Sequence, residues 1–192
     1  MSAHRPIATT RSAAGIPTGR LAMWWLLASE IVIFGGLLVS YILLRLRHES
    51  WSDYASHTNT AAGATNTFVL LTSSLFAVLA HQAAENKDGR KAFKFLWLTI
   101  CGGLVFMMIK AYEYTTEIHE GFTITANVFW SFYYTATGLH GLHVIAGMTA
   151  MAIVSFQALK GENLQRVEYV GIYWHFVDVV WIFLFPLLYI AK

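Results

Sequence analysis

His175 and Asp178 are the two side chains with the clearest capacity for chemistry, because they stand in a stretch apolar enough to cross a membrane. That stretch reads YWHFVDVVWIFLFP, from Tyr173 to Pro186. A spacing of three residues places both side chains on one face of a helix. An Asp near the centre of a membrane helix costs about 2.5 to 3.5 kcal/mol on insertion scales, so it needs a partner or a function. We expect His175 and Asp178 to satisfy each other and a neighbouring helix, and Pro186 to bend the helix near its end.

Glu30 lies about midway along a second apolar run, LASEIVIFGG. Three interpretations fit a carboxyl in that position: a proton-relay group, a hydrogen-bonded link between helices, and a lipid-facing acid kept neutral. From the residues alone, the structural link is favoured over the proton relay.

The pattern TGLHGLHVIAG, which starts at Thr137, combines small residues with two histidines. Gly138, Gly141 and Gly147 allow another helix to approach closely, as membrane helices associate through small residues. Gly35 and Gly36, in the same apolar run as Glu30, predict a second helix-packing position.

His140 and His143 are three residues apart, a spacing that could suit a metal if His175 and Asp178 joined them. The only cysteine, Cys101, sits in an apolar run and is expected to be a small core residue. No thiolate is available and no third His stands on a neighbouring turn, so we expect no metal site in this chain. No residue here looks like a nucleophile with a base, so we expect no catalytic site, and we expect no cofactor site. The favoured interpretation is that neutral histidines donate to carbonyls or carboxylates across the bundle.

Lys110 begins the run KAYEY, in which Glu113 stands three residues further on. Such a pair can interact along a helix, and tyrosines suit a membrane interface. An anchored helix end is therefore the favoured interpretation.

The elements that must position these side chains are membrane helices. Of the 192 residues, 56% are hydrophobic and only 12% are charged, which indicates a multi-span membrane protein. The fold class is an all-α bundle of five transmembrane helices, preceded by an arm at 1–20 that carries no evident cleavable signal peptide. The expected helices cover about 21–44, 62–82, 93–112, 128–159 and 170–191.

Basic residues predict the orientation of this bundle. They gather before the first helix, between the second and third, and between the fourth and fifth, which all fall on one side. The positive-inside rule then makes the N-terminus cytoplasmic and the C-terminus external. A net charge of +2 gives no indication of nucleic-acid binding.

Five motifs in order resemble subunit III of the heme-copper cytochrome c oxidases. The resemblance covers about 19–192. The chain is similar to the short, five-helix bacterial type, which lacks the first two helices of the seven-helix long form. The motifs are LASE at Leu27–Glu30, NTFVLLTSS at Asn66–Ser74, KAYEY at Lys110–Tyr114, TGLHGLHVIAG at Thr137–Gly147 and YWHFVDVVW at Tyr173–Trp181.

The resemblance implies a non-catalytic subunit of an oxidase that passes electrons from cytochrome c to dioxygen and pumps protons. Heme and copper would sit in partner subunits, and this chain would contact catalytic subunit I, other oxidase subunits and structural phospholipid in the bacterial cytoplasmic (inner) membrane. A larger respiratory supercomplex is a compatible setting. The family's buried carboxyl corresponds to Glu30, and its histidine and aspartate to His175 and Asp178. These residues would sustain proton uptake or support the structure. Without the first two helices, a neighbouring subunit or lipid would have to supply one wall of the family's lipid cleft.

Two alternatives remain at this stage. One is a subunit III-like component of a quinol oxidase or a nitric oxide reductase, although the spelling YWHFVD favours the cytochrome c branch. The other is a stand-alone proton-coupled transporter, for which inverted repeats and broken helices would be expected but are not evident.

Overall fold

The computed structural model describes residues 12–13, 16–48 and 51–191. Its helices are α2 (Thr18–Arg45), α3 (Trp51–Ser56), α4 (Thr60–Glu85), α5 (Gly89–His119), α6 (Val128–Leu159), α7 (Gln165–Phe185) and the π-helical turn η1 (Pro186–Ile190). Two short strands, β1 (Ser12–Ala13) and β2 (Ile16–Pro17), pair antiparallel before α2. Residues 1–11 and 14–15 of the arm expected at 1–20 lie outside the described residues. The last three residues of that arm already belong to α2, which begins at Thr18.

Five helices of the described chain are long and apolar enough to cross a membrane, which confirms the predicted number. The bounds of α6 match the prediction, whereas α2, α4 and α5 extend past both predicted ends and α7 begins five residues before the predicted 170. The polar first turns of α4 and α5 are not detected by hydropathy. Side chains of Asn59, Asp88 and Asn127 accept hydrogen bonds from backbone N–H groups at the starts of α4, α5 and α6. These caps satisfy N–H groups that have no partner within the helix, so each polar first turn is stable.

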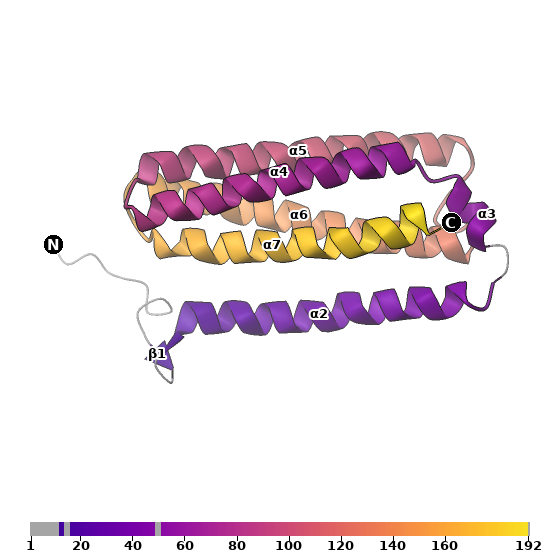
Figure 1. Cartoon of the computed structure of the whole chain (residues 1–192), viewed down its shortest axis with the longest axis horizontal. Coiled ribbons are helices and arrows are strands. Elements are labelled where there is room, and N and C mark those ends of the chain that lie inside the picture. The colour runs from indigo at the N-terminus through magenta and orange to yellow at the C-terminus, as the bar shows by residue number, and fades with distance from the viewer. Residues whose placement is uncertain (1–11, 14–15, 49–50, 192) are drawn as a thin grey trace.

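Helices α4 to α7 form a compact bundle, and α2 runs beside α7 on its outer side (Figure 1). In α2 only Leu27, Phe34 and Tyr41 are buried. They are seven residues apart, so α2 meets the bundle along a single narrow seam. At the end of that seam the Tyr41 hydroxyl donates to the carbonyl of Leu187 at 2.7 Å and accepts from the Trp51 indole at 3.1 Å.

The glycines that permit close packing are mostly different from those predicted. A Cβ at Gly35 or Gly36 would meet nothing within 4 Å, so neither glycine packs closely against another helix of the described chain. Gly147 does pack tightly, because a Cβ would lie 3.0 Å from the Trp174 ring, whereas Gly138 and Gly141 leave ordinary spacing.

The tightest approaches involve α5. A Cβ at Gly89 would collide with the carbonyl oxygen of Ala158, and one at Gly102 would lie 2.6 Å from the Cβ of Ser73. Cys101, beside Gly102, is exposed. The expectation of a core cysteine is therefore wrong, because this residue faces outward from α5, where an apolar run also suits contact with lipid.

Pro186 changes the last turn of the fifth span. α7 ends at Phe185 and continues as the π-helical turn, in which the Ala191 N–H donates to the Pro186 carbonyl at 2.8 Å. Proline cannot donate to the α-helical pattern, which accounts for the change at this residue. The turn places Leu188 and Tyr189 in the core, where both are almost fully buried.

Candidate functional site

Glu30 and His143 meet between α2 and α6. The distance from Glu30 Oε2 to His143 Nε2 is 3.0 Å, and the two side chains are 20% and 15% exposed. The other ring nitrogen, Nδ1, lies 2.8 Å from the carbonyl oxygen of Leu139 one turn earlier in α6. The carboxyl therefore links two helices, as the favoured interpretation of Glu30 predicts.

The bond to Leu139 restricts the protonation of this pair. A carbonyl oxygen only accepts, so Nδ1 of His143 must carry a proton. Nε2 then either carries a second proton, facing a carboxylate, or accepts from a protonated Glu30. In both cases one proton lies between Nε2 and Oε2, and the pair is neutral overall.

Aromatic rings flank the imidazole of His143. The Phe34 ring meets it edge-on with centroids 5.1 Å apart, and the Tyr173 ring stacks with it at 6.5 Å. These rings flank a hydrogen bond whose two side chains are partly exposed at the surface of the bundle. The arrangement holds one proton between two helices midway along α2.

His175 and Asp178 do not satisfy each other, contrary to expectation. His175 Nδ1 lies 2.6 Å from the Ser74 hydroxyl of α4. Asp178 is 4% exposed, and neither of its oxygens has a hydrogen-bond partner among the described residues. Both side chains lie on one face of α7, as their spacing predicts. The imidazole of His175 points toward α4 and shares a hydrogen bond with the Ser74 hydroxyl. Ser74 also lies close to Asp178.

His140 is fully buried between aromatic rings. Its ring centroid lies 5.4 Å from that of Phe106 and 5.2 Å from that of Trp181, and within the described residues neither ring nitrogen has a hydrogen-bond partner. The predicted donation across the bundle therefore applies to His143 and not to His140. Over the described ranges, no three His, Cys, Asp or Glu side chains gather as a metal site would require.

A buried cluster around Lys110 was not predicted. Its ammonium group donates to Glu113 Oε2 at 2.9 Å, to the Tyr133 hydroxyl at 3.0 Å and to the Tyr189 hydroxyl at 2.8 Å. The Lys110 and Glu113 side chains are only 5% and 2% exposed. The favoured interpretation, an anchored helix end, is therefore wrong: the ion pair points into the bundle, where α5, α6 and η1 meet.

The direction of each hydrogen bond in this cluster is fixed. The Tyr189 hydroxyl donates to Glu113 Oε2 at 3.1 Å, so in its 3.0 Å contact with Tyr133 the proton comes from Tyr133. All three N–H groups of Lys110 are also used. Charge-assisted bonds of this kind satisfy the buried ammonium and one carboxylate oxygen. In the sequence, the spacing of Lys110 and Glu113 indicates that these two side chains can pair. Nothing local indicates Tyr189 as their partner, because it lies 76 residues away from Glu113.

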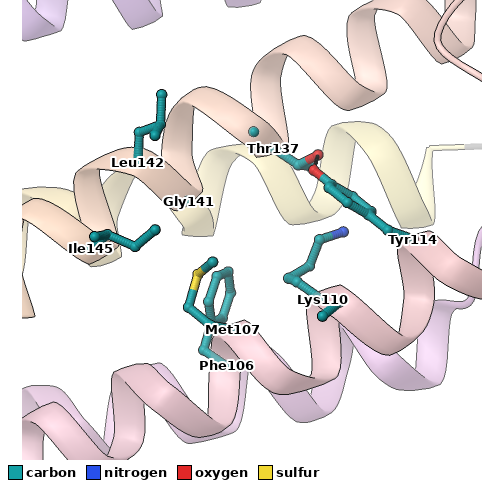
Figure 2. A pocket seen from close by; sticks show the side chains of 10 residues that line it. Phe106, Met107, Lys110, Tyr114, Thr137, Gly141, Leu142 and Ile145 are labelled. Carbon is teal, nitrogen blue, oxygen red and sulfur yellow. Dashed lines mark hydrogen bonds between the residues drawn. The ribbon is translucent and has the colours of Figure 1, made fainter.

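Beside this cluster lies a cavity of about 250 Å³ between α5 and α6, with Lys110 and Tyr114 at one end and Leu142 and Ile145 at the other (Figure 2). Most of its lining is apolar, and the Tyr114 hydroxyl is held at 2.6 Å from that of Thr137. A second apolar groove of about 210 Å³ lies between α2 and α7 and is lined by Phe34, Gly35, Phe176 and their neighbours.

Comparison with known proteins identifies the family of this chain. The family described as cytochrome c oxidase subunit III matches residues 9–192. The chain belongs to the cytochrome c oxidase subunit III family. Among its relatives, cytochrome c oxidase subunit 3 of Thermostichus vulcanus is 37% identical over 85% of this chain and 83% of its own length. Cytochrome c oxidase subunit 3 of Bacillus sp. (strain PS3) is 33% identical over 88% and 84%.

A longer relative, the probable cytochrome c oxidase subunit 3 of Rickettsia felis, is 40% identical over 65% of this chain and 46% of its own length. Membership identifies the chain as a multi-pass subunit III of a heme-copper oxidase, and so as part of an oxidoreductase complex with other subunits. The family assignment implies that the catalytic metal centre lies outside this chain. This confirms the resemblance drawn from the five ordered motifs.

Proposed function

We propose that this subunit III is non-catalytic and stabilises catalytic subunit I of a proton-pumping oxidase that transfers electrons from cytochrome c to dioxygen. The observation that supports the proposal is the 3.0 Å contact between Glu30 Oε2 and His143 Nε2, two partly exposed side chains on different helices. In this role the pair supplies protons toward the neighbouring subunit during turnover, and the subunit thereby prolongs the working life of the oxidase.

Lipid binding is the second part of the proposal. The groove between α2, the helix of Glu30, and α7 is almost entirely apolar, so an acyl chain fits its lining. The cavity between α5 and α6 offers a similar apolar surface. Since van der Waals contact rather than water exclusion holds membrane helices together, lipid in the first groove would strengthen the attachment of α2.

The setting we propose is the bacterial cytoplasmic membrane, with the N-terminus cytoplasmic and the C-terminus external. The distribution of basic residues supports this orientation. Subunit I is the proposed direct partner, with a respiratory supercomplex as a wider assembly. A quinol oxidase or a nitric oxide reductase is the alternative complex, and identification of the co-purifying chains by mass spectrometry distinguishes them.

The test uses Glu30→Ala and Glu30→Gln in the intact oxidase. We expect both variants to keep an initial rate of oxygen consumption close to that of the unmodified enzyme but to lose activity after fewer turnovers. The amide of Gln can still donate to His143 but cannot release a proton. Glu162→Gln, which changes an exposed carboxylate in the loop before α7, is the matched control.

The two substitutions separate proton supply from structure. If Glu30→Gln lasts as long as the unmodified enzyme while Glu30→Ala does not, the carboxyl is a structural link. Inactivation kinetics that stay unchanged in both would refute a role for Glu30 in sustaining turnover.

A further inference from the structure

Exposed basic side chains gather at the junction where α5 begins and α6 ends. The two helices pack directly on each other there, because a Cβ at Gly89 would collide with the carbonyl oxygen of Ala158. Three exposed side chains lie at this junction and form no ion pair with any described residue: Arg90, Lys94 and Lys160.

The carboxylates near the junction do not balance these charges. Asp88 pairs with Lys91 at 3.2 Å, and the Glu85 carboxylate lies 3.4 Å from His81 Nε2 on α4. In the described turns beside the junction, Glu162 is the carboxylate that remains without a basic partner. An anion, and not a further cation, would therefore complement the junction.

The basic side chains lie at the depth of lipid headgroups. α5 has 31 residues and is therefore about 46 Å long, whereas a hydrocarbon core is about 30 Å thick. The first turns of α5, which carry Arg90 and Lys94, therefore extend beyond the core. Basic side chains in that position attract anionic lipids.

Three aromatic rings form a platform one helical turn from the basic side chains. The Phe93 ring of α5 lies between those of Trp97 and Phe156, with centroids 6.1 Å and 5.9 Å away. The Trp97 and Phe156 rings are 6.3 Å apart, so this aromatic platform joins α5 to α6. Trp97 is 36% exposed, and its indole N–H has no hydrogen-bond partner among the described residues. Such a ring suits a membrane interface, where the N–H can donate to a phosphate or ester oxygen.

An exposed stripe on α6 leads from the aromatic platform toward the middle of the helix. Five exposed side chains follow one another at intervals of three or four residues and share one helix face: Phe156, Ile153, Thr149, Ile145 and Leu142. The Thr149 hydroxyl donates to the Ile145 carbonyl at 2.8 Å, so the stripe offers no free polar hydrogen. Ile145 and Leu142 also line the cavity between α5 and α6 (Figure 2).

The stripe has the depth of one lipid leaflet. From Phe156 to Ile145 the helix rises about 16 Å, which is about half of the hydrocarbon core. An acyl chain that starts at the aromatic platform therefore reaches the near end of the cavity. That end is apolar, so it must be filled by hydrocarbon when the bundle is in a membrane.

We propose that the junction of α5 and α6 binds an anionic phospholipid such as phosphatidylglycerol. The phosphodiester lies among Arg90, Lys94 and Lys160, and one acyl chain follows the stripe to the cavity. A choline or ethanolamine headgroup would add a positive charge among unpaired cations, so the anionic headgroup is preferred. The inference rests on the proposed lipid binding and assigns it a headgroup class and a position separate from the groove between α2 and α7.

The experiment measures lipid retention by the intact, delipidated oxidase complex in native mass spectrometry. The probes are phosphatidylglycerol, phosphatidylethanolamine and phosphatidylcholine with identical chains. The unmodified complex should retain phosphatidylglycerol more strongly than either zwitterionic lipid. Lys94→Gln and Lys160→Gln should each weaken retention of phosphatidylglycerol about fivefold and leave phosphatidylcholine unchanged.

Two variants serve as controls. Arg47→Gln removes an exposed basic side chain beyond the other end of α2 and should change retention of none of the lipids. Lys94→Arg keeps the charge and should retain phosphatidylglycerol as the unmodified complex does. All of these positions are exposed, so the variants test binding without disturbing the buried core.

Amine acetylation of Lys94 and Lys160 provides a second measurement. Both should react in the delipidated complex and become protected when phosphatidylglycerol, but not phosphatidylcholine, is added. Protection without any lipid would show that another oxidase subunit covers the junction, and it would overturn the proposal. Protection by inorganic phosphate as strong as that by phosphatidylglycerol would overturn it too, because the site would then bind a free anion.

The outcome is separate from the proposed function. Equal retention of the three lipids, or no effect of Lys94→Gln and Lys160→Gln, would overturn the headgroup assignment and leave lipid binding itself in place. A Glu30→Gln oxidase with normal phosphatidylglycerol retention and an unchanged lifetime would refute proton supply and leave this site standing.

Discussion

Removal of the Lys110 ammonium group tests whether the buried cluster stabilises the bundle. In Lys110→Met the apolar side chain fills similar space, but Glu113 keeps only the hydrogen bond from Tyr189 among the contacts described above. We expect a large loss of stability, because a buried carboxylate that loses its ion-pair partner is strongly unfavourable.

The size of the loss can be bounded. Breaking a buried pair by removing one partner costs about 3 to 5 kcal/mol. An independent limit comes from protonation: converting a glutamate in water to its neutral form at pH 7 costs about 3.7 kcal/mol. Two hydrogen bonds from Lys110 to Tyr133 and Tyr189 are also lost, at about 1 kcal/mol each or less. The expected loss is therefore about 3 to 5 kcal/mol.

The assay is denaturant titration of the purified oxidase, followed by release of the subunit and by its circular dichroism. Lys94→Met, at an exposed position on the same helix, is the control and should change stability by less than about 0.5 kcal/mol. The double variant Lys110→Met with Glu113→Leu should recover most of the loss, since both charges are gone and Tyr189 can still bond to Tyr133. A single variant as stable as the control, or a double variant no better than the single one, would refute the reasoning.

Two further predictions concern helix packing and capping. Gly89→Ala should destabilise the bundle by about 1 to 3 kcal/mol because the new Cβ meets the Ala158 carbonyl. Gly35→Ala has open space around the new Cβ and should be neutral or stabilising by up to about 1 kcal/mol. Thermal unfolding of both variants checks this, and equal losses of stability would contradict it. The Lys91 N–H donates to the Asp88 side chain at 3.0 Å and lowers the pKa of that carboxyl. Its capping contribution is therefore complete above about pH 3.9, the usual value for Asp, and is lost as the pH falls through the lowered pKa. Hydrogen exchange at the start of α5 should accelerate in that acid range for the unmodified chain and show no such step for Asp88→Ala.

The number and type of long helices could be predicted from the sequence because a span of apolar residues is a local property. The polar ends could not: the first turn of α5 depends on the Asp88 cap, and its last turns depend on Glu113 and Glu117 facing inward. Hydropathy treats such residues as signs that the span has ended. The predicted third helix was consequently too short at both ends.

The partners of the polar side chains were harder to predict than the side chains themselves. Glu30 was expected to link helices and does so, but its partner was identified only when α6 placed His143 beside it. His175 was paired with Asp178 because that partner is close in sequence, whereas Ser74 lies on another helix. For the same reason Lys110 was assigned to an interface, although Tyr189 closes over it from the far end of the chain. Helical spacing restricts a side chain to a face but does not define what that face meets.

The narrow seam of α2 has a consequence for the order in which the protein is built. α2 is synthesised well before α7, along which it runs. Until α7 arrives, α2 must persist as a separate helix in the bilayer, and its many exposed apolar residues suit it to that state. It then joins the finished bundle through few contacts: Leu27, Phe34 and Tyr41 along the seam, the Glu30 bond at its middle, and the Arg20 and Glu168 ion pair at its start. Docking of α2 thus has to wait for helices synthesised after it, and faulty copies should arise as bundles of α4 to α7 with α2 left unattached in the membrane.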